Sequence, residues 1–234
     1  KSEARKSLNN IVQMAKTNKE IGVIIGPHAS VITIVDETGN ILTENDILVI
    51  LSLFYLKYGK AKTINIPVTS SMTLEELIMK NGGRAARRSS KLRSIENIHD
   101  LFDGSHGDKY PYLEMVFDPM ITFIRILEFL SLENRPLSEI KDTIPKNNMI
   151  STAQHCSTEE KAAIMRNLTS TLQQKKIELI DGIRIIEENA WILILPDAIN
   201  PTIHLFAEGK TADARDRILE EYSMKIKKQT SGLI

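Results

Sequence analysis

The sequence is poor in cysteine, in long apolar runs and in any excess of charge. Cys156 is its only cysteine, which excludes an intramolecular disulfide and a zinc site with several thiolates, so a cytoplasmic location is expected. The 30 basic residues are balanced by 30 acidic ones, and a neutral chain has no overall field to attract nucleic acid or an anionic membrane. The most apolar run, residues 47–56, is about half as long as a bilayer-spanning helix, so it predicts a buried helix.

An initial methionine is missing as well, because the chain begins with Lys1. We therefore expect the sequence to be a piece of a longer protein. Its 234 residues, 42% of them apolar and 26% charged, have the composition of an ordinary globular chain with one large or two small domains.

The apolar pattern predicts an α/β domain followed by an α+β domain. Strands are predicted at 21–25, 31–36, 63–68 and 84–88, between helices over 2–16, 46–58, 73–81 and 91–101, and this order indicates a mixed α/β sandwich over residues 1–104. A connecting loop and helices follow over 105–146. Strands at 149–155, 181–186, 191–195 and 203–208 predict a smaller antiparallel sheet with helices on one face over 147–234.

Several helix starts carry capping signals. The expected caps are Ser157 with Glu160, Thr73 with Glu76, and Asn45 or Asp46. Ser70 and Ser71 lie between a strand and a helix, where a hydroxyl could serve as a nucleophile. Because no glycine-framed turn surrounds them, capping is the better interpretation.

The order of the predicted elements and the residues at their turns resemble those of the α-D-phosphohexomutases, the phosphomannomutase and phosphoglucomutase family. The second half resembles the last domain of that family through Asp181-Gly182, Trp191, Pro196, Pro201 and Ala207-Glu208. The first half resembles its third domain through Gly22-Val23-Ile24-Ile25, Pro27, Ala29 and Val35-Asp36-Glu37. The resemblance covers nearly the whole chain and implies that the part of the family that carries the catalytic phosphoserine is absent, so no catalytic residue is predicted here.

In the family, a metal loop of the form Asp-Pro-Asp-Ala-Asp-Arg holds magnesium. The aligned segment reads Gly26-Pro27-His28-Ala29-Ser30-Val31, so Gly26, His28 and Ser30 stand where the resemblance places carboxylates. Magnesium requires several oxygen ligands, and a single imidazole does not replace them. We therefore expect no metal and no other cofactor.

The family's phosphate loop, close to Arg-Pro-Ser-Gly-Thr-Glu-Pro, is altered in a similar way. The aligned segment reads Leu195-Pro196-Asp197-Ala198-Ile199-Asn200-Pro201. Leu195 replaces the arginine, Ala198 the glycine and Ile199 the threonine, while Asp197 adds a negative charge. Phosphate binding calls for cationic donors, hydroxyls or bare amides, so we expect this loop to have lost that function.

A basic cluster offers a separate anion-binding candidate at Arg84, Arg87 and Arg88. Such residues hold a sugar phosphate or the phosphates of a nucleotide sugar. The alternative is a solvated face whose charge is balanced by Glu75 and Glu76, and we favour it. Nucleic acid is not expected, because aromatic residues are not interleaved with the basic ones.

Three hypotheses for function remain open. The closest resemblance is to the mutase-like region that follows a sugar nucleotidyltransferase domain in some bacterial proteins, such as mannose-1-phosphate guanylyltransferases. It implies a non-catalytic structural or regulatory region whose partner is the upstream domain. The alternatives are an active half of a phosphohexomutase, interconverting hexose 1- and 6-phosphates, and a module that senses a nucleotide sugar. A homo-oligomer is compatible with each of them.

Overall fold

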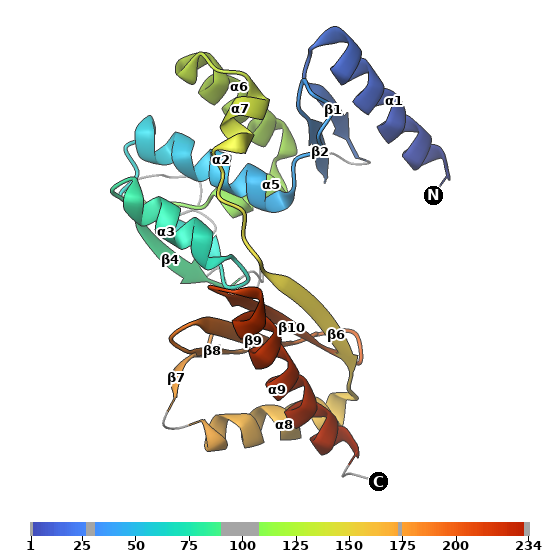
Figure 1. The fold of residues 1–234 in the computed structure, drawn as a ribbon, viewed down its shortest axis with the longest axis vertical. Coiled ribbons are helices and arrows are strands. Elements are labelled where there is room, and N and C mark those ends of the chain that lie inside the picture. The colour runs from blue at the N-terminus through green and yellow to red at the C-terminus, as the bar shows by residue number, and fades with distance from the viewer. Residues whose placement is uncertain (1, 27–30, 90–107, 173–174, 232–234) are drawn as a thin grey trace. The chain divides into compact units, whose positions relative to one another are not determined.

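The computed structural model describes residues 2–26, 31–89, 108–172 and 175–231. Its chain forms two compact units (Figure 1). The first contains the described residues up to Arg87 and from Asp108 to Pro145, and the second contains Arg88, Ser89 and the described residues from Lys146 onward. The mixed α/β class predicted from the sequence is confirmed, and the described residues of the predicted connecting segment belong almost entirely to the first unit.

The first unit opens with a helix packed on a hairpin. Helix α1 (Ser2–Asn18) lies against strands β1 (Gly22–Ile25) and β2 (Ile32–Val35), which pair antiparallel. Gly22 permits this close approach, because a Cβ at that position would lie 2.5 Å from Cγ2 of Ile11. The strands predicted at 21–25 and 31–36 are both formed, and they pack against the first helix.

Helix α2 (Glu44–Lys57) is the buried helix predicted from the apolar run. Every residue from Ile47 to Tyr55 is buried, so the helix has no polar face. Its N-cap is Thr43, whose hydroxyl accepts from the Asp46 N–H while the Asp46 carboxylate accepts from the Thr43 N–H. The prediction that Asn45 or Asp46 is the cap was wrong, because Asp46 closes the capping box from its third position.

A small sheet and four further helices make up the rest of the described residues of the first unit. The sheet has the strand order β4 (Arg84–Arg88), β3 (Thr63–Pro67) and β5 (Asp108–Lys109), with β3 and β5 parallel. The helices are α3 (Met72–Lys80), α5 (Pro111–Phe117), α6 (Pro119–Glu133) and α7 (Leu137–Asp142). The N-cap of α3 is Ser71 rather than the predicted Thr73, so the hydroxyl at Ser71 does have the capping role. The helix predicted over residues 91–101 lies outside the described residues.

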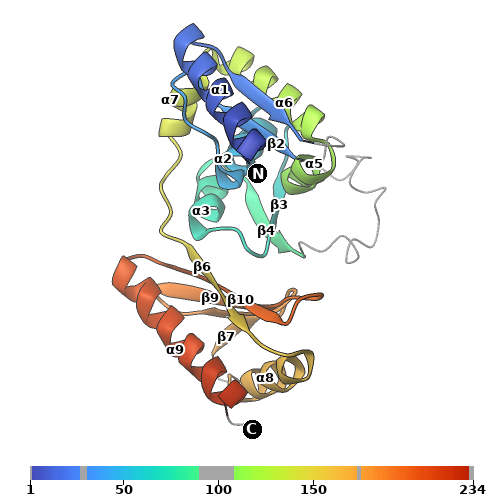
Figure 2. The same cartoon turned by 90° about the vertical axis from the view of Figure 1, so that its right-hand side faces the viewer.

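The second unit is an antiparallel sheet with two helices on one face, as predicted (Figure 2). Its strands, in spatial order, are β6 (Ile150–His155), β10 (Thr202–Gly209), β9 (Ala190–Pro196), β8 (Ile183–Ile186) and β7 (Lys176–Glu178). The helices are α8 (Thr158–Thr171) and α9 (Ala212–Ser231). The capping box predicted for Ser157 and Glu160 is confirmed at the start of α8.

Each unit has its own hydrophobic core. In the first, α2 packs with β3, α3 and α6 around residues such as Ile50, Ile64 and Phe129. In the second, alternate residues of β8, β9 and β10 pack beneath α8 and α9, among them Ile192 and Leu205. Among the helices of the described ranges, none combines the length and apolarity that crossing a bilayer requires.

Candidate functional site

The loop between β9 and β10 is folded around the side chain of Asp197. Its Oδ1 accepts hydrogen bonds from the backbone N–H groups of Ile199 and Asn200, both at 2.8 Å. Its Oδ2 lies 3.2 Å from the side-chain nitrogen of Asn200 and 3.1 Å from Nε2 of His204 on β10. An aspartate that hydrogen-bonds the backbone two and three residues ahead forms an Asx-type turn. The Asp197 carboxylate therefore occupies two backbone amides of its own loop.

Lys161 of α8 fixes the loop from the other side. Its ammonium donates to the carbonyl oxygens of Asp197, at 2.8 Å, and of Asn200. The side chain is buried, with 8% of the residue exposed. Burying an ammonium group without acceptors costs free energy. The Lys161 ammonium therefore holds the backbone of the loop through these two hydrogen bonds.

The surroundings of Asp197 keep its carboxylate ionised. The amide N–H groups of Asn200 and Ile199, together with His204, hold the pKa of Asp197 well below its usual range. At the crown of the loop Ile199 is 90% exposed, and Leu195 is half-buried at the end of β9. Four of the five residues predicted as an altered phosphate loop, from Asp197 to Asn200, lie in this turn, and Leu195 lies in β9 just before it. Their failure to bind phosphate stays a prediction.

The predicted metal loop lies mostly outside the described residues, since His28 and Ser30 fall within 27–30. Gly26 directly follows β1, and its N–H donates to the Val31 carbonyl at 2.8 Å. Across residues 2–26, 31–89, 108–172 and 175–231, no group of three or more His, Cys, Asp or Glu side chains is placed to hold a metal ion. The predicted inability of this loop to hold magnesium stays a prediction.

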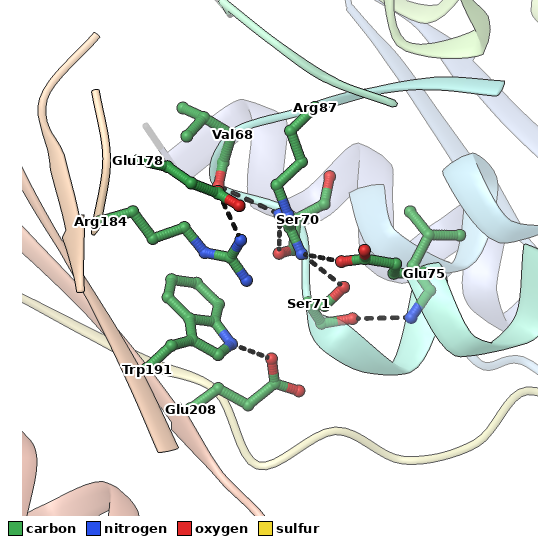
Figure 3. Close-up of polar contacts among 10 residues, drawn as sticks. Val68, Ser70, Ser71, Glu75, Arg87, Glu178, Arg184, Trp191 and Glu208 are labelled. Carbon is green, nitrogen blue, oxygen red and sulfur yellow. Dashed lines mark hydrogen bonds and ion pairs between the residues drawn. The ribbon is translucent and has the colours of Figure 1, made fainter. Parts of the chain in front are cut away.

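Arg87 forms a structural network within the first unit (Figure 3). Its Nη1 donates to the carbonyl oxygens of Ser70 at 2.7 Å and Val68 at 3.2 Å, and its Nη2 pairs with Glu75 at 3.0 Å. Only 6% of the Arg87 side chain is exposed. The guanidinium therefore ties β4 to the segment between β3 and α3.

Arg84 and Arg88, at the two ends of β4, are exposed. Their binding of a sugar phosphate or a nucleotide sugar stays a prediction.

A second polar network was not foreseen from the sequence. On β8, β9 and β10 of the second unit, Arg184, Trp191 and Glu208 are all buried. The Trp191 indole N–H donates to Glu208 at 2.9 Å, the Arg184 guanidinium stacks 4.6 Å from the Trp191 ring, and Arg184 pairs with Glu178 at 2.8 Å (Figure 3). By strand alternation, Trp191 and Glu208 lie on the sheet face opposite α8 and α9. The sequence did contain a signal for this network, because Arg184 and Glu208 are charged residues within otherwise apolar strands.

Ser71, one of the two serines considered as a nucleophile, has the capping role instead, and the single cysteine is buried. The Ser71 hydroxyl accepts from the Leu74 N–H at 3.2 Å. Cys156 is fully buried, and burial raises the pKa of its thiol, which lowers its reactivity.

The fold is that of phosphoglucomutase-family domains, and the homologues and structural neighbours of the chain are phosphohexomutases. A crystal structure of a phosphoglucomutase/phosphomannomutase family protein from Burkholderia thailandensis superposes with a TM-score of 0.73 at 15% identity, covering 96% of this chain and 50% of that one. Phosphoglucomutase (parafusin) from Paramecium superposes with a TM-score of 0.61 at 13% identity, covering 95% and 49%. No family model matches the sequence.

Two curated proteins are similar to this chain in sequence. The phosphopentomutase of Thermococcus kodakarensis is 25% identical over 225 residues, which is 90% of this chain and 50% of that protein. A probable phosphoglucosamine mutase of Pyrococcus horikoshii is 24% identical over 235 residues, or 95% and 52%. The chain thus spans about half the length of the relatives it matches. The predicted relationship to phosphohexomutases is confirmed, whereas the link to a nucleotidyltransferase stays a prediction.

Proposed function

We propose that the chain is the C-terminal, phosphohexomutase-like part of a longer sugar-nucleotide biosynthesis protein and does not itself bind a substrate phosphate. Its role is structural or regulatory, beside an upstream domain that acts as a hexose-1-phosphate nucleotidyltransferase. The observation that carries the proposal is the Asp197 carboxylate, which already accepts from the amides of Ile199 and Asn200.

The proposal follows from how anions are bound in proteins. A phosphate group is held by cationic side chains, hydroxyls or free backbone amides. In this loop the amides donate to Asp197, the Lys161 ammonium donates to carbonyl oxygens, and Leu195 offers no donor. An incoming phosphate would have to displace a carboxylate of the same charge sign, and the two anions repel each other.

Phosphate titration of the 234-residue chain tests the proposal. In amide-resolved NMR, we expect glucose 1-phosphate to produce no saturable shift at Ile199 or Asn200 up to about 10 mM. The Asp197→Ser variant, which frees both amides and adds a hydroxyl, is expected to show saturable shifts there. Saturation of the unaltered chain at the same amides with a Kd below about 1 mM would overturn the proposal.

A second candidate, an active phosphohexomutase half, is favoured by the match to mutases over 85–95% of the chain. The full-length protein distinguishes the two. An active mutase interconverts hexose 1- and 6-phosphates in the presence of magnesium. The proposed non-catalytic region leaves no such activity once the nucleotidyltransferase site is disabled. The full-length gene also tests for the upstream domain itself.

A further inference from the structure

Helix α6 of the first unit is apolar on its outer face as well as on its inner one. Its inner face packs in the first core through Ile126 and Phe129. The large apolar residues of the outer face, each 37–50% exposed, are Met120, Ile121, Ile124, Leu127 and Leu132. Helix α9 is longer, yet it has one such residue among those described, Met224. A helix that is apolar on both faces is normally buried on both, and clustered apolar exposure indicates a contact surface.

The outer face of α6 consists of two adjacent rows, because residues at i, i+4, i+7 and i+11 lie in line along a helix. The first row holds Met120, Ile124, Leu127 and Ser131, and the second holds Ile121, Arg125, Glu128 and Leu132. In the second row Arg125 pairs with Glu128 at 2.9 Å, and their side chains are 37% and 45% exposed. The second row therefore has opposite charges at its middle and an apolar residue at each end.

We propose that this face of α6 binds the same face of a second copy of the chain, with the two helices antiparallel. When the two-fold axis passes between residues 126 and 127, Arg125 lies opposite Glu128 of the second copy. Ile121 lies opposite Leu132 in the same register, and Leu127 lies beside Leu127 at the centre. A two-fold interface requires such a self-complementary surface. Parallel helices would instead place like charges opposite each other, which is why the antiparallel arrangement is favoured.

The size of the face sets the strength of the contact. The exposed apolar side chains and the stems of the two charged residues of two copies bury about 1,000 Å² together, which is the lower limit for a specific interface. We therefore expect a weak dimer with a Kd on the order of 10–100 µM. The inference goes beyond the proposed function, because it uses neither the 195–201 loop nor phosphate binding.

Sedimentation equilibrium of the 234-residue chain from about 5 to 500 µM tests the inference. We expect a monomer–dimer equilibrium. Ile124→Asp places a charge in the apolar row and should raise the Kd at least about 10-fold. The matched control is Met224→Asp, because Met224 of α9 is 49% exposed and Ile124 is 50% exposed; this variant should keep the Kd of the unaltered chain.

A charge exchange tests the proposed pairing across the contact. Glu128→Arg and Arg125→Glu each place charges of one sign on both sides, so each variant alone should dimerise at least about 10-fold more weakly. An equal mixture of the two restores opposite charges at both pairs, and we expect a heterodimer with about the Kd of the unaltered chain. Adding Ile124→Asp to either variant should abolish the heterodimer, which separates a specific contact from general attraction between oppositely charged chains.

Three results would overturn the inference. The first is a chain that stays monomeric up to about 500 µM, which would assign the face to another part of the protein or to no partner. The others are equal effects of Ile124→Asp and Met224→Asp, and a mixture that associates no more than either charge variant alone.

Circular dichroism shows whether each variant is folded. Arg125 lies 5.5 Å from the Phe54 ring, so Arg125→Glu is the variant most exposed to misfolding. If it does not fold, Glu128→Arg is compared with Glu139→Arg, which alters a carboxylate of the same unit that is 59% exposed and lies outside α6. Equal Kd values for these two variants would also overturn the inference. Phosphate binding at Asp197 is measured separately, so failure of one proposal leaves the other standing.

Discussion

At the scale of single residues, the structure changes the interpretation of two side chains most clearly. Arg87 belongs to a basic cluster in the sequence, yet its guanidinium donates to backbone carbonyl oxygens and pairs with Glu75. Asp197 was expected only to repel phosphate, but it also occupies two amides of its loop. In both cases the residue type was visible in the sequence and the partners were not, because they depend on local backbone directions.

Replacement of Arg87 should destabilise the first unit strongly. Arg87→Ala leaves the carbonyl oxygens of Val68 and Ser70 without this donor, and we expect the free energy of unfolding to fall by about 2–4 kcal/mol. Arg84→Ala is the matched control, because Arg84 lies on the same strand and is exposed; its effect should stay within about 0.5 kcal/mol. Urea denaturation measures both. Equal effects would show that the Arg87 contacts contribute little.

The ionised form of Asp197 should make stability depend on pH. Because the folded-state pKa of Asp197 lies below its ordinary value of 3.8, its contribution is fully present above that pH and is lost as the pH falls through the folded pKa. Asp197→Asn keeps an acceptor but loses the charge, so it should unfold more readily than the unaltered chain at pH 7. The difference should shrink below pH 3.8.

Thermal unfolding between pH 2 and 7 measures the effect. Glu188→Gln, which changes an exposed carboxylate of the same unit, is the control and should show no comparable trend. A difference for Asp197→Asn that is independent of pH would contradict the role assigned to the charge.

At the scale of helices and strands, most of the second unit could be predicted from the sequence and its caps. The Ser157–Glu160 spacing identified the start of α8, because a capping box is a local contact between residues three apart. The start of α2 was misplaced because Thr43, Asn45 and Asp46 are all acceptable caps, and only the backbone decides among them. Strand β7 and helix α5 were missed, since three residues and seven residues carry too little periodicity.

Removal of the α8 cap should have a moderate effect. Ser157→Ala removes the oxygen that accepts from the Glu160 N–H and should lower the free energy of unfolding by about 1 kcal/mol. Ser170→Ala makes the same chemical change near the end of the same helix, where the hydroxyl bonds only the Asn167 carbonyl, and should change stability by less than about 0.5 kcal/mol. Chemical denaturation of both variants compares them directly. The capping role is refuted if Ser170→Ala costs as much.

At the scale of the whole molecule, the chain contains two separate hydrophobic clusters. The apolar helix over residues 47–56 identified the centre of the first, and the strands around Trp191 identified the sheet of the second. The altered Asp197 loop could be located from its prolines, but its internal hydrogen bonds could not.

Truncation of each core should act first on its own unit. Ile126 and Ile192 are fully buried in the first and second cores respectively, and Ile→Ala at either position should cost about 2–5 kcal/mol. In hydrogen exchange, Ile126→Ala should reduce protection most in α2, α6 and β3, and Ile192→Ala most in β8, β9 and β10. Each variant is the control for the other. Identical protection losses throughout the chain would contradict two distinct cores.

The burial of Trp191 gives the protein an intrinsic optical probe. It is the chain's only tryptophan, it is fully buried on β9, and its indole N–H is bonded to Glu208. Its fluorescence emission therefore comes from one known position in the second unit, without any label. A shift of that emission to longer wavelength would follow the loosening of this sheet, whereas four of the five tyrosines, Tyr55, Tyr58, Tyr110 and Tyr112, lie in the first unit and only Tyr222 lies in the second.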